Sequence, residues 1–159
     1  RQVKEACFSY VNPKQTKNPE ILHVSEDMSS QIGISEADVD SETFTKVFTG
    51  NKVLENTTPY AMCYGGHQFG NWAGQLGDGR AINLFEVEHN DKHWAVQLKG
   101  AGETPYSRTA DGLAVLRSSI REYLCSEAMF HVGVPTTRAV SVGLSGDEVM
   151  RDMLYDGGL

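Results

Sequence analysis

A glycine-rich run from Gly65 to Arg80 holds the residues whose types and spacing suit chemistry on a phosphate. It contains six glycines within sixteen residues. Glycine allows backbone conformations that a side chain forbids, so that successive N–H groups can point into one concavity and hold an anion. Arg80 ends the run with a forked cation that suits a phosphate oxygen. The run therefore predicts a phosphate-binding loop, against the alternative of tight turns between strands.

The segments that follow the run indicate which class of phosphate-binding loop it resembles. The run lacks the Gly-Lys-Ser/Thr ending of a Walker A loop, and no helix directly follows it as in a dinucleotide-binding fingerprint. A strand-like segment over Ala81–Glu88 comes next, and a second over Trp94–Leu98 leads to Lys99. This order of elements, a glycine-rich loop followed by two strands and a lysine, is typical of a nucleotide-binding lobe of the protein-kinase kind.

Lys99 needs a carboxylate to hold it towards a phosphate; the alternative is a solvated lysine at a strand end. The next helical segment offers Glu122 and Glu127. At about 100° per residue, Glu127 falls within the apolar stripe and Glu122 lies on the far side of it. The pattern therefore predicts Glu127 as the buried partner. The stripe consists of Leu113, Leu116, Ile120, Tyr123 and Leu124.

The elements that must position these residues are a helix and several hairpins. A helix is predicted from about Gly112 to His131, with Asp111 as its N-cap and Gly133 and Pro135 as its stop. A turn over His89–Lys92 is predicted to join the two strands before Lys99 into an antiparallel hairpin.

Further connections are predicted on both sides of the helix. Gly100–Pro105 is either a plain connector or a second loop that faces phosphate or ribose. Strands over Arg138–Leu144 and Glu148–Leu154 are predicted to form a hairpin around Ser145–Asp147. Tyr155–Leu159 is interpreted as the start of a loop.

The first part of the chain, about residues 1–60, shows no chemistry-bearing pattern. Ser35–Val47 predicts a short helix with Ser35 as its cap and acidic residues in its first turn. This part is expected to pack on the remainder, residues 61–159, and to cover a sheet edge.

Composition excludes several classes of function. The chain has 159 residues, 40% of them hydrophobic, which suits one domain with a core. A net charge of −7 argues against a nucleic-acid or anionic-membrane surface, and no apolar run has the length of a membrane span. The histidines and the three cysteines show no metal-ligand spacing, and no disulfide framework is implied. Surface ion pairing is the expected role of Arg108, Arg117, Arg121 and Arg138.

Long motifs resemble the selenoprotein O family, also called the YdiU family. The resemblance covers nearly the whole chain, and its motifs are Tyr64–Arg80, Gln97–Arg108, Arg117–Met129, Pro135–Arg138 and Val149–Asp152. It implies an α+β, protein-kinase-like N-terminal lobe: an antiparallel sheet with one long helix, truncated before the C-terminal lobe. It also implies ATP bound in a flipped orientation and AMP transfer to Ser, Thr or Tyr hydroxyls of proteins.

The resemblance also assigns residues. Lys99 would bind phosphate, and Glu122 rather than Glu127 would be its helix partner. The other nucleotide contacts implied by motif position are Gly77, Gly79, Arg80, Asp111 and Gly112.

The remaining implications concern cofactor, partners and location. ATP and Mg²⁺ are expected, with the catalytic base and the metal-binding Asp and Asn beyond residue 159, so that the chain is expected to be a fragment inactive by itself. Proteins with hydroxyl side chains are the expected substrates, with no nucleic acid or membrane as partner. The family is intracellular, cytoplasmic in bacteria and mitochondrial in eukaryotes. Kinase-type phosphoryl transfer and a nucleotide-sensing module without turnover stay open as alternatives.

Overall fold

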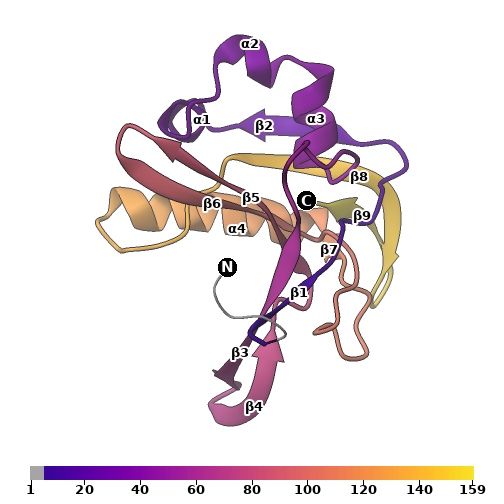
Figure 1. The fold of residues 1–159 in the computed structure, drawn as a ribbon. Helices are drawn as coiled ribbons and strands as arrows, with labels where there is room; N and C mark the ends of the chain where they lie inside the picture. Colours follow the sequence, from indigo (N-terminus) through magenta and orange to yellow (C-terminus); the bar gives the residue numbers. More distant parts are fainter. Residues whose placement is uncertain (1–5) are drawn as a thin grey trace.

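The computed structural model describes residues 6–159, which form two antiparallel sheets and four helices (Figure 1). The first sheet has the order β1 (Phe8–Tyr10), β3 (Tyr60–Gln68), β5 (Ala81–His89) and β6 (Lys92–Lys99), and β4 (Asn71–Gly77) pairs with β3. The second has the order β2 (Glu20–Val24), β8 (Ser141–Met150), β9 (Leu154–Gly158) and β7 (Ala114–Val115). The helices are α1 (Glu26–Gln31), α2 (Glu36–Val39), α3 (Glu42–Phe48) and α4 (Leu116–His131). The expected α+β class, with antiparallel strands and one long helix, is confirmed.

The first part of the chain contributes to both sheets. β1 lies at an edge of the first sheet and pairs with β3, and β2 lies at an edge of the second and pairs with β8. Residues 1–5 of the expected N-terminal extension lie outside the described residues. The proposed division at residue 60 stays a prediction.

The single helix predicted over Ser35–Val47 is wrong, because two helices occupy this segment. Ser35 caps α2 as predicted and forms a capping box with Asp38. Ser41 then caps α3, since its hydroxyl accepts the Phe44 N–H at 3.1 Å. A second N-cap residue inside the predicted helix therefore starts a new helix.

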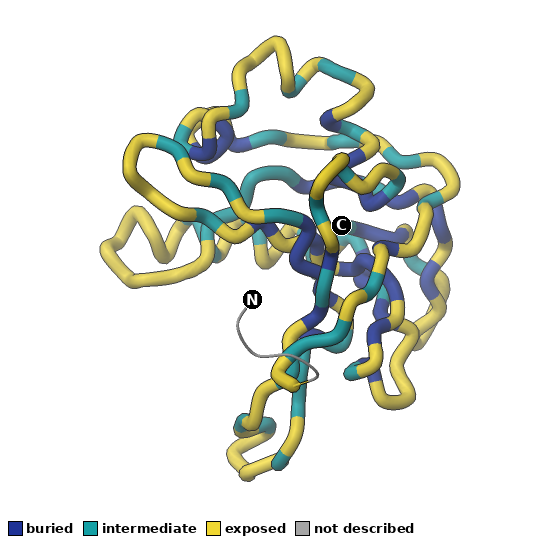
Figure 2. The backbone as a smooth tube through the Cα atoms, in the orientation of Figure 1, coloured by how far each residue is buried: buried dark blue, intermediate teal, exposed yellow. Residues whose placement is uncertain are grey.

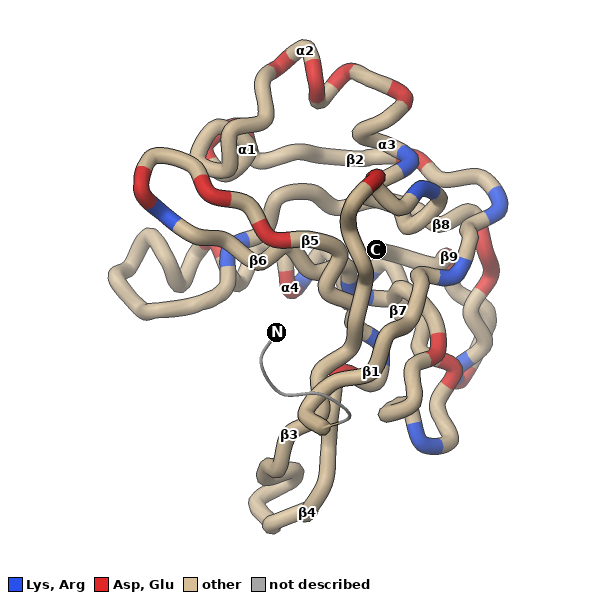
Figure 3. The backbone as a smooth tube through the Cα atoms, viewed as in Figure 1, with Lys and Arg blue, Asp and Glu red and all other residues tan. Residues whose placement is uncertain are grey.

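The glycine-rich run forms a hairpin rather than a loop up to Gly77. β3 and β4 pair around a turn at Phe69 and Gly70, and phosphate binding by this run stays a prediction. The hairpin extends away from the other strands in Figure 1, and it is mostly exposed in Figure 2. No Lys, Arg, Asp or Glu lies on it (Figure 3). Only the link Asp78–Arg80 remains irregular.

The predicted hairpin before Lys99 is confirmed as β5 and β6. Asn90 and Asp91 form its turn with φ of 49° and 58°, as in the type I′ turns that suit twisted strands. Ala81 pairs with Lys99, so the lysine lies opposite the strand residue that directly follows Arg80.

The long helix ends at His131 as predicted but begins later. α4 starts at Leu116, and its N-cap, Val115, makes no side-chain cap hydrogen bond. Asp111 is therefore not the N-cap; it accepts the Leu113 N–H at 3.0 Å ahead of β7. Among residues 6–159, no helix combines the length and the apolar character that crossing a bilayer requires.

The predicted turn at Ser145–Asp147 is wrong. These residues lie within β8, at an irregularity of its register with β9, where Gly146 has a φ of +72°. A left-handed glycine inside a strand makes a bulge, so the chain continues and reverses at Arg151–Met153. The loop expected over Tyr155–Leu159 is wrong as well, because most of this segment belongs to β9.

Two apolar clusters hold the fold together. The larger one joins α1 and α3 to β6 and contains Met28, Ile32, Phe44, Val47, Phe48 and Val96. The smaller one contains Ile82, Leu84, Leu98 and Ala101. α4 has no buried residue, and Leu124, predicted to be buried, is 61% exposed. The predicted apolar stripe is therefore wrong as a description of what α4 buries.

We expect Phe44→Ala to lower the free energy of unfolding by about 3–5 kcal/mol, since Phe44 is buried and stacks on Phe48 with ring centroids 4.2 Å apart. Urea denaturation measures this value. Phe69→Ala is the matched control, because Phe69 is 93% exposed; equal losses in the two variants would contradict the assignment of the core.

Candidate functional site

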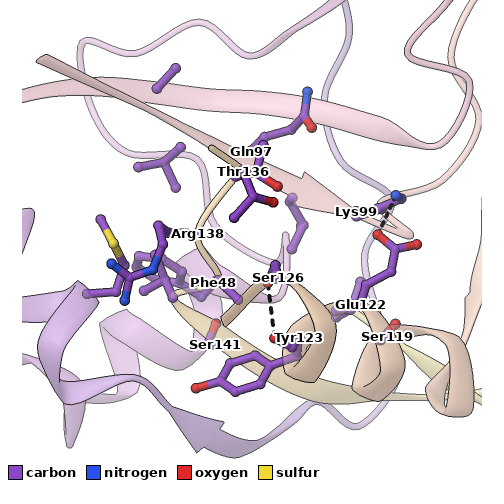
Figure 4. A pocket seen from close by; sticks show the side chains of 18 of the residues that line it. Phe48, Gln97, Lys99, Ser119, Glu122, Tyr123, Ser126, Thr136, Arg138 and Ser141 are labelled. Carbon is purple, nitrogen blue, oxygen red and sulfur yellow. Dashed lines mark hydrogen bonds and ion pairs between the residues drawn. The ribbon is translucent and has the colours of Figure 1, made fainter. Parts of the chain in front are cut away.

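An ion pair joins the end of β6 to the second turn of α4. Lys99 Nζ lies 2.5 Å from Glu122 Oε2, and Arg80 Nη2 lies 3.7 Å from the other carboxylate oxygen (Figure 4 shows the lysine pair). The side chains of Lys99, Arg80 and Glu122 are all about half exposed. Such a pair contributes little to stability, but it holds two cations at an accessible surface.

The carboxylate that the helical wheel selected has a different partner. Glu127 binds Arg138 through two hydrogen bonds of 2.7 and 2.8 Å. The wheel prediction of the Lys99 partner is therefore wrong, since the structure pairs Lys99 with Glu122, the residue that the family resemblance implies. Glu127 is nevertheless the more buried of the two carboxylates, as the wheel predicted. The expectation that Arg138 is a surface arginine is also wrong, since its side chain is 4% exposed. The Arg138 guanidinium holds the pKa of Glu127 below its usual range.

A second ion pair lies beside Arg80. Arg151 donates to both carboxylate oxygens of Asp111 at 2.7 and 3.0 Å, and these hydrogen bonds lower the pKa of Asp111. Arg80, Asp111, Gly112 and Arg151 line a hollow of about 430 Å³. Reasoning from the sequence did not single out Arg151 as a site residue, although it lies in the Val149–Asp152 motif, because only the fold brings it to Asp111.

The segment that links β4 to β5 fixes the position of the Arg80 backbone. Asp78 is buried, and its carboxylate accepts the Met62 N–H at 2.9 Å. A Cβ on Gly77 would lie 2.5 Å from the Tyr106 ring and 2.6 Å from the Met62 carbonyl oxygen. The Gly79 carbonyl accepts the Ser107 hydroxyl at 2.5 Å. Close packing of the chain on itself thus accounts for Gly77, and contact of either glycine with a nucleotide stays a prediction.

Gly112 has a similar structural reason. Its φ is +69°, and a Cβ there would overlap the Gly102 carbonyl. The Gly102 N–H in turn donates to the Gly112 carbonyl at 3.1 Å. Ala101 and Thr104 are buried in the same segment, which supports the connector interpretation of Gly100–Pro105.

A cavity of about 670 Å³ separates α4 from β6. Apolar residues such as Leu84, Val96 and Leu98 line the side formed by the sheet, whereas Ser119, Ser126 and Tyr123 line the side formed by the helix. Lys99 and Glu122 lie at one part of its wall and Arg138 at another (Figure 4).

The part of the chain that the structure describes contains no candidate metal site. Residues 6–159 contain no group of three or more His, Cys, Asp or Glu side chains that could hold a metal ion. Cys7, Cys63 and Cys125 are free.

The fold and the site together define an α+β domain in which two accessible cations share one helix carboxylate. Its family follows from comparison with known sequences. The family described as "Protein adenylyltransferase SelO" matches residues 1–154, and the chain belongs to this family.

Bacterial relatives match over 99% of the chain. A protein nucleotidyltransferase YdiU from Flavobacterium johnsoniae is 66% identical, and proteins of the same name from Rhodopirellula baltica and Tolumonas auensis are 61% and 57% identical. The chain spans about 30% of the length of these curated relatives.

We expect Gly112→Ala to lower the free energy of unfolding by more than Gly133→Ala. Both glycines have φ near +70 to +80°, so both changes carry the left-handed strain of about 1–2 kcal/mol. Only Gly112 adds the overlap with Gly102, because nothing lies within 4 Å of a Cβ at Gly133. Urea denaturation of both variants measures the difference, and equal losses would contradict this packing.

Acid is expected to weaken the carboxylate–arginine pairs. The pKa values of Asp27, Asp111 and Glu127 are lowered by hydrogen bonds from Arg138 or Arg151, so these pairs stabilise the fold above the ordinary carboxyl range. This stabilisation is lost as pH falls through the lowered pKa values, below about pH 4.

The measurement is Tm against pH for the wild type and for Glu127→Gln. The wild type is expected to be the more stable protein at pH 7, with the difference shrinking below about pH 4. Glu55→Gln, at an exposed position, is the control. A difference between wild type and Glu127→Gln that does not change with pH would refute the assignment.

Proposed function

We propose that this chain forms the nucleotide-binding part of a protein adenylyltransferase, which transfers AMP from ATP to Ser, Thr or Tyr hydroxyls of proteins. The observation that carries the proposal is the pairing of Lys99 and Arg80 with Glu122 at an accessible cleft. The family's description, and the name nucleotidyltransferase that its relatives carry, support it.

The order of elements supports a kinase-like N-terminal lobe. A glycine-rich hairpin, β3 and β4, precedes the strand pair β5 and β6, and α4 follows with the carboxylate that pairs with Lys99. Protein kinases place a strand lysine and a helix glutamate in the same relation, with the lysine directed at phosphates. We therefore assign Lys99 to ATP phosphates and Glu122 to orienting it.

The proposed chemistry is a displacement at the α-phosphorus. The acceptor hydroxyl oxygen bonds to this phosphorus while the bond to the α–β bridging oxygen breaks, so that pyrophosphate leaves and the hydroxyl proton passes to a base. Negative charge grows on the leaving phosphates, and fixed cations stabilise that charge. Lys99 and Arg80 are the cations that we assign to this role, and Gly77 and Gly79 precede Arg80 in the same segment.

Asp111, Gly112 and Arg151 are proposed to form the neighbouring part of the nucleotide site. They line one hollow with Arg80. The bidentate pair fixes the Arg151 guanidinium in one orientation, since two parallel hydrogen bonds set its plane. An anion in this hollow would meet Arg80 and Arg151 together.

Residues 6–159 offer no group of three or more His, Cys, Asp or Glu side chains that could hold Mg²⁺. We assign no residue of this chain to the metal and none to the catalytic base. The activity and substrates of the whole protein are likewise proposals, since the chain spans about 30% of its relatives.

The test incubates the protein, at the length that its gene encodes, with Mg²⁺ and with ATP labelled at the α- or the γ-phosphate. It measures how much label is transferred to protein. Label is expected from the α-phosphate and not from the γ-phosphate. Lys99→Ala is expected to lower the rate by about 10²–10³-fold, as when one transition-state donor is lost. Lys92→Ala, on the same strand, is the matched control and keeps the rate.

The other outcomes separate the alternatives. Transfer of γ-label would establish kinase-type phosphoryl transfer and refute the proposal. ATP binding without any transfer would favour a nucleotide-sensing module. An unchanged rate in Lys99→Ala would remove Lys99 from the site.

A further inference from the structure

α4 carries Glu122 to Lys99, but the strands that it packs against are β7, β8 and β9 of the second sheet and not β6, which bears Lys99. The helix has no buried residue, its N-cap makes no side-chain hydrogen bond, and the 670 Å³ cavity separates it from β6. Packing of an amphipathic face normally supplies most of a helix's stability in a protein. Other contacts must therefore hold α4 at the distance that lets Glu122 reach Lys99.

One such contact is a charge cluster at the C-terminal half of α4, in which Arg138 and Glu127 are mostly buried and Asp27 is exposed. Arg138 binds Glu127 through two hydrogen bonds and Asp27 of α1 through a third at 2.9 Å. The side chains of Arg138 and Glu127 are 4% and 18% exposed. The guanidinium also lies over the Phe130 ring of α4, 3.7 Å from its centroid. Arg138 thus contacts α4 twice and α1 once.

α1 connects this cluster back to the strand that bears Lys99. Met28 of α1 and Ile32, the C-cap residue of α1, pack in the same apolar cluster as Val96, three residues before Lys99 on β6. β6, α1, Arg138 and α4 therefore form a closed ring, in which Lys99 and Glu122 make the final contact. Glu127 lies five residues after Glu122, about 7.5 Å along the helix axis.

We propose that Arg138 and Glu127 are positioning residues that hold α4 where Glu122 meets Lys99. The mostly buried Arg138–Glu127 pair is suited to this role, because breaking such a pair leaves an uncompensated charge. The exposed Lys99–Glu122 pair is too weak to hold the helix by itself. The consequence for catalysis rests on the proposed function, whereas the consequence for the geometry does not.

The first test measures acylation of Lys99 by an amine-selective acetylating ester, read by mass spectrometry without nucleotide. A lysine held by a carboxylate is expected to react slowly, since its amine must leave the carboxylate before it can meet the reagent. Glu127→Gln is expected to raise the Lys99 rate by up to about fivefold, the factor that loss of an exposed pair of about 1 kcal/mol gives. Glu122→Gln is expected to raise it equally.

Glu42→Gln is the matched control for this test, because it removes an ion pair with Lys46 that lies on α3, away from α4. It should leave the Lys99 rate unchanged. Circular dichroism checks that each variant folds. Arg138→Lys is the second variant: it keeps the charge but loses the two parallel hydrogen bonds, and it should raise the Lys99 rate in part. A wild-type Lys99 rate in the folded variants would overturn the proposal.

The second test is a double-mutant cycle on AMP transfer by the protein at its natural length. Glu127→Gln is expected to lower kcat/KM for ATP by about 10-fold or more, since small displacements of positioned groups have such effects. In a Glu122→Gln background the same change should add little, because Glu127 acts through Glu122.

The two proposals fail in different ways. If Glu127→Gln lowers kcat/KM by the same factor with and without Glu122→Gln, the positioning role is overturned. A general loss of stability would act in this way, independently of Glu122. Absence of AMP transfer by the wild type would refute the proposed function alone, and the Lys99 acylation rates would still decide the positioning role.

Discussion

The contact between Lys99 and Glu122 is the interaction on which the candidate site depends. It links a sheet to a helix that buries none of its residues, across a cavity rather than through a packed interface. An ion pair that is half exposed contributes little free energy, so its geometry has to be set by the elements on either side. The order of the site is therefore a property of its surroundings, chiefly the apolar cluster around α1 and the Arg138 cluster.

The glycines near the site have a similar explanation. Gly77 and Gly112 lie where two chain segments approach too closely for a Cβ, and the Ser107 hydroxyl bonds the Gly79 carbonyl. These contacts tie the segment before Arg80 to the segment before Asp111. The two cationic parts of the site are thus joined through backbone packing, which gives these glycines a structural role whatever ligand the hollow binds.

Some patterns confined to neighbouring residues were predictable from the sequence, whereas the turn expected at Ser145–Asp147 was not. The β5–β6 hairpin has alternating residues and a left-handed turn at Asn90 and Asp91, so local signals specify it. The partner of Lys99 was not predictable from the helical wheel, which assumes that a helix buries its apolar stripe. Here Leu124 is exposed and Tyr123 is partly buried. The family resemblance implied the right glutamate because it does not depend on that assumption.

Charge balance explains why one arginine cluster suits a phosphate and the other does not. Arg138 is nearly buried and pairs with two carboxylates, so its cluster carries a net charge of −1. Such a cluster does not attract an anion. Lys99 and Arg80 share the single carboxylate of Glu122, which leaves a net charge of +1 at an accessible surface. In a chain of net charge −7, this local excess is a specific attraction for an anion. Under the proposed function, the weakness of the Lys99–Glu122 pair has a use, because a bound phosphate would share both cations without first breaking a strong contact.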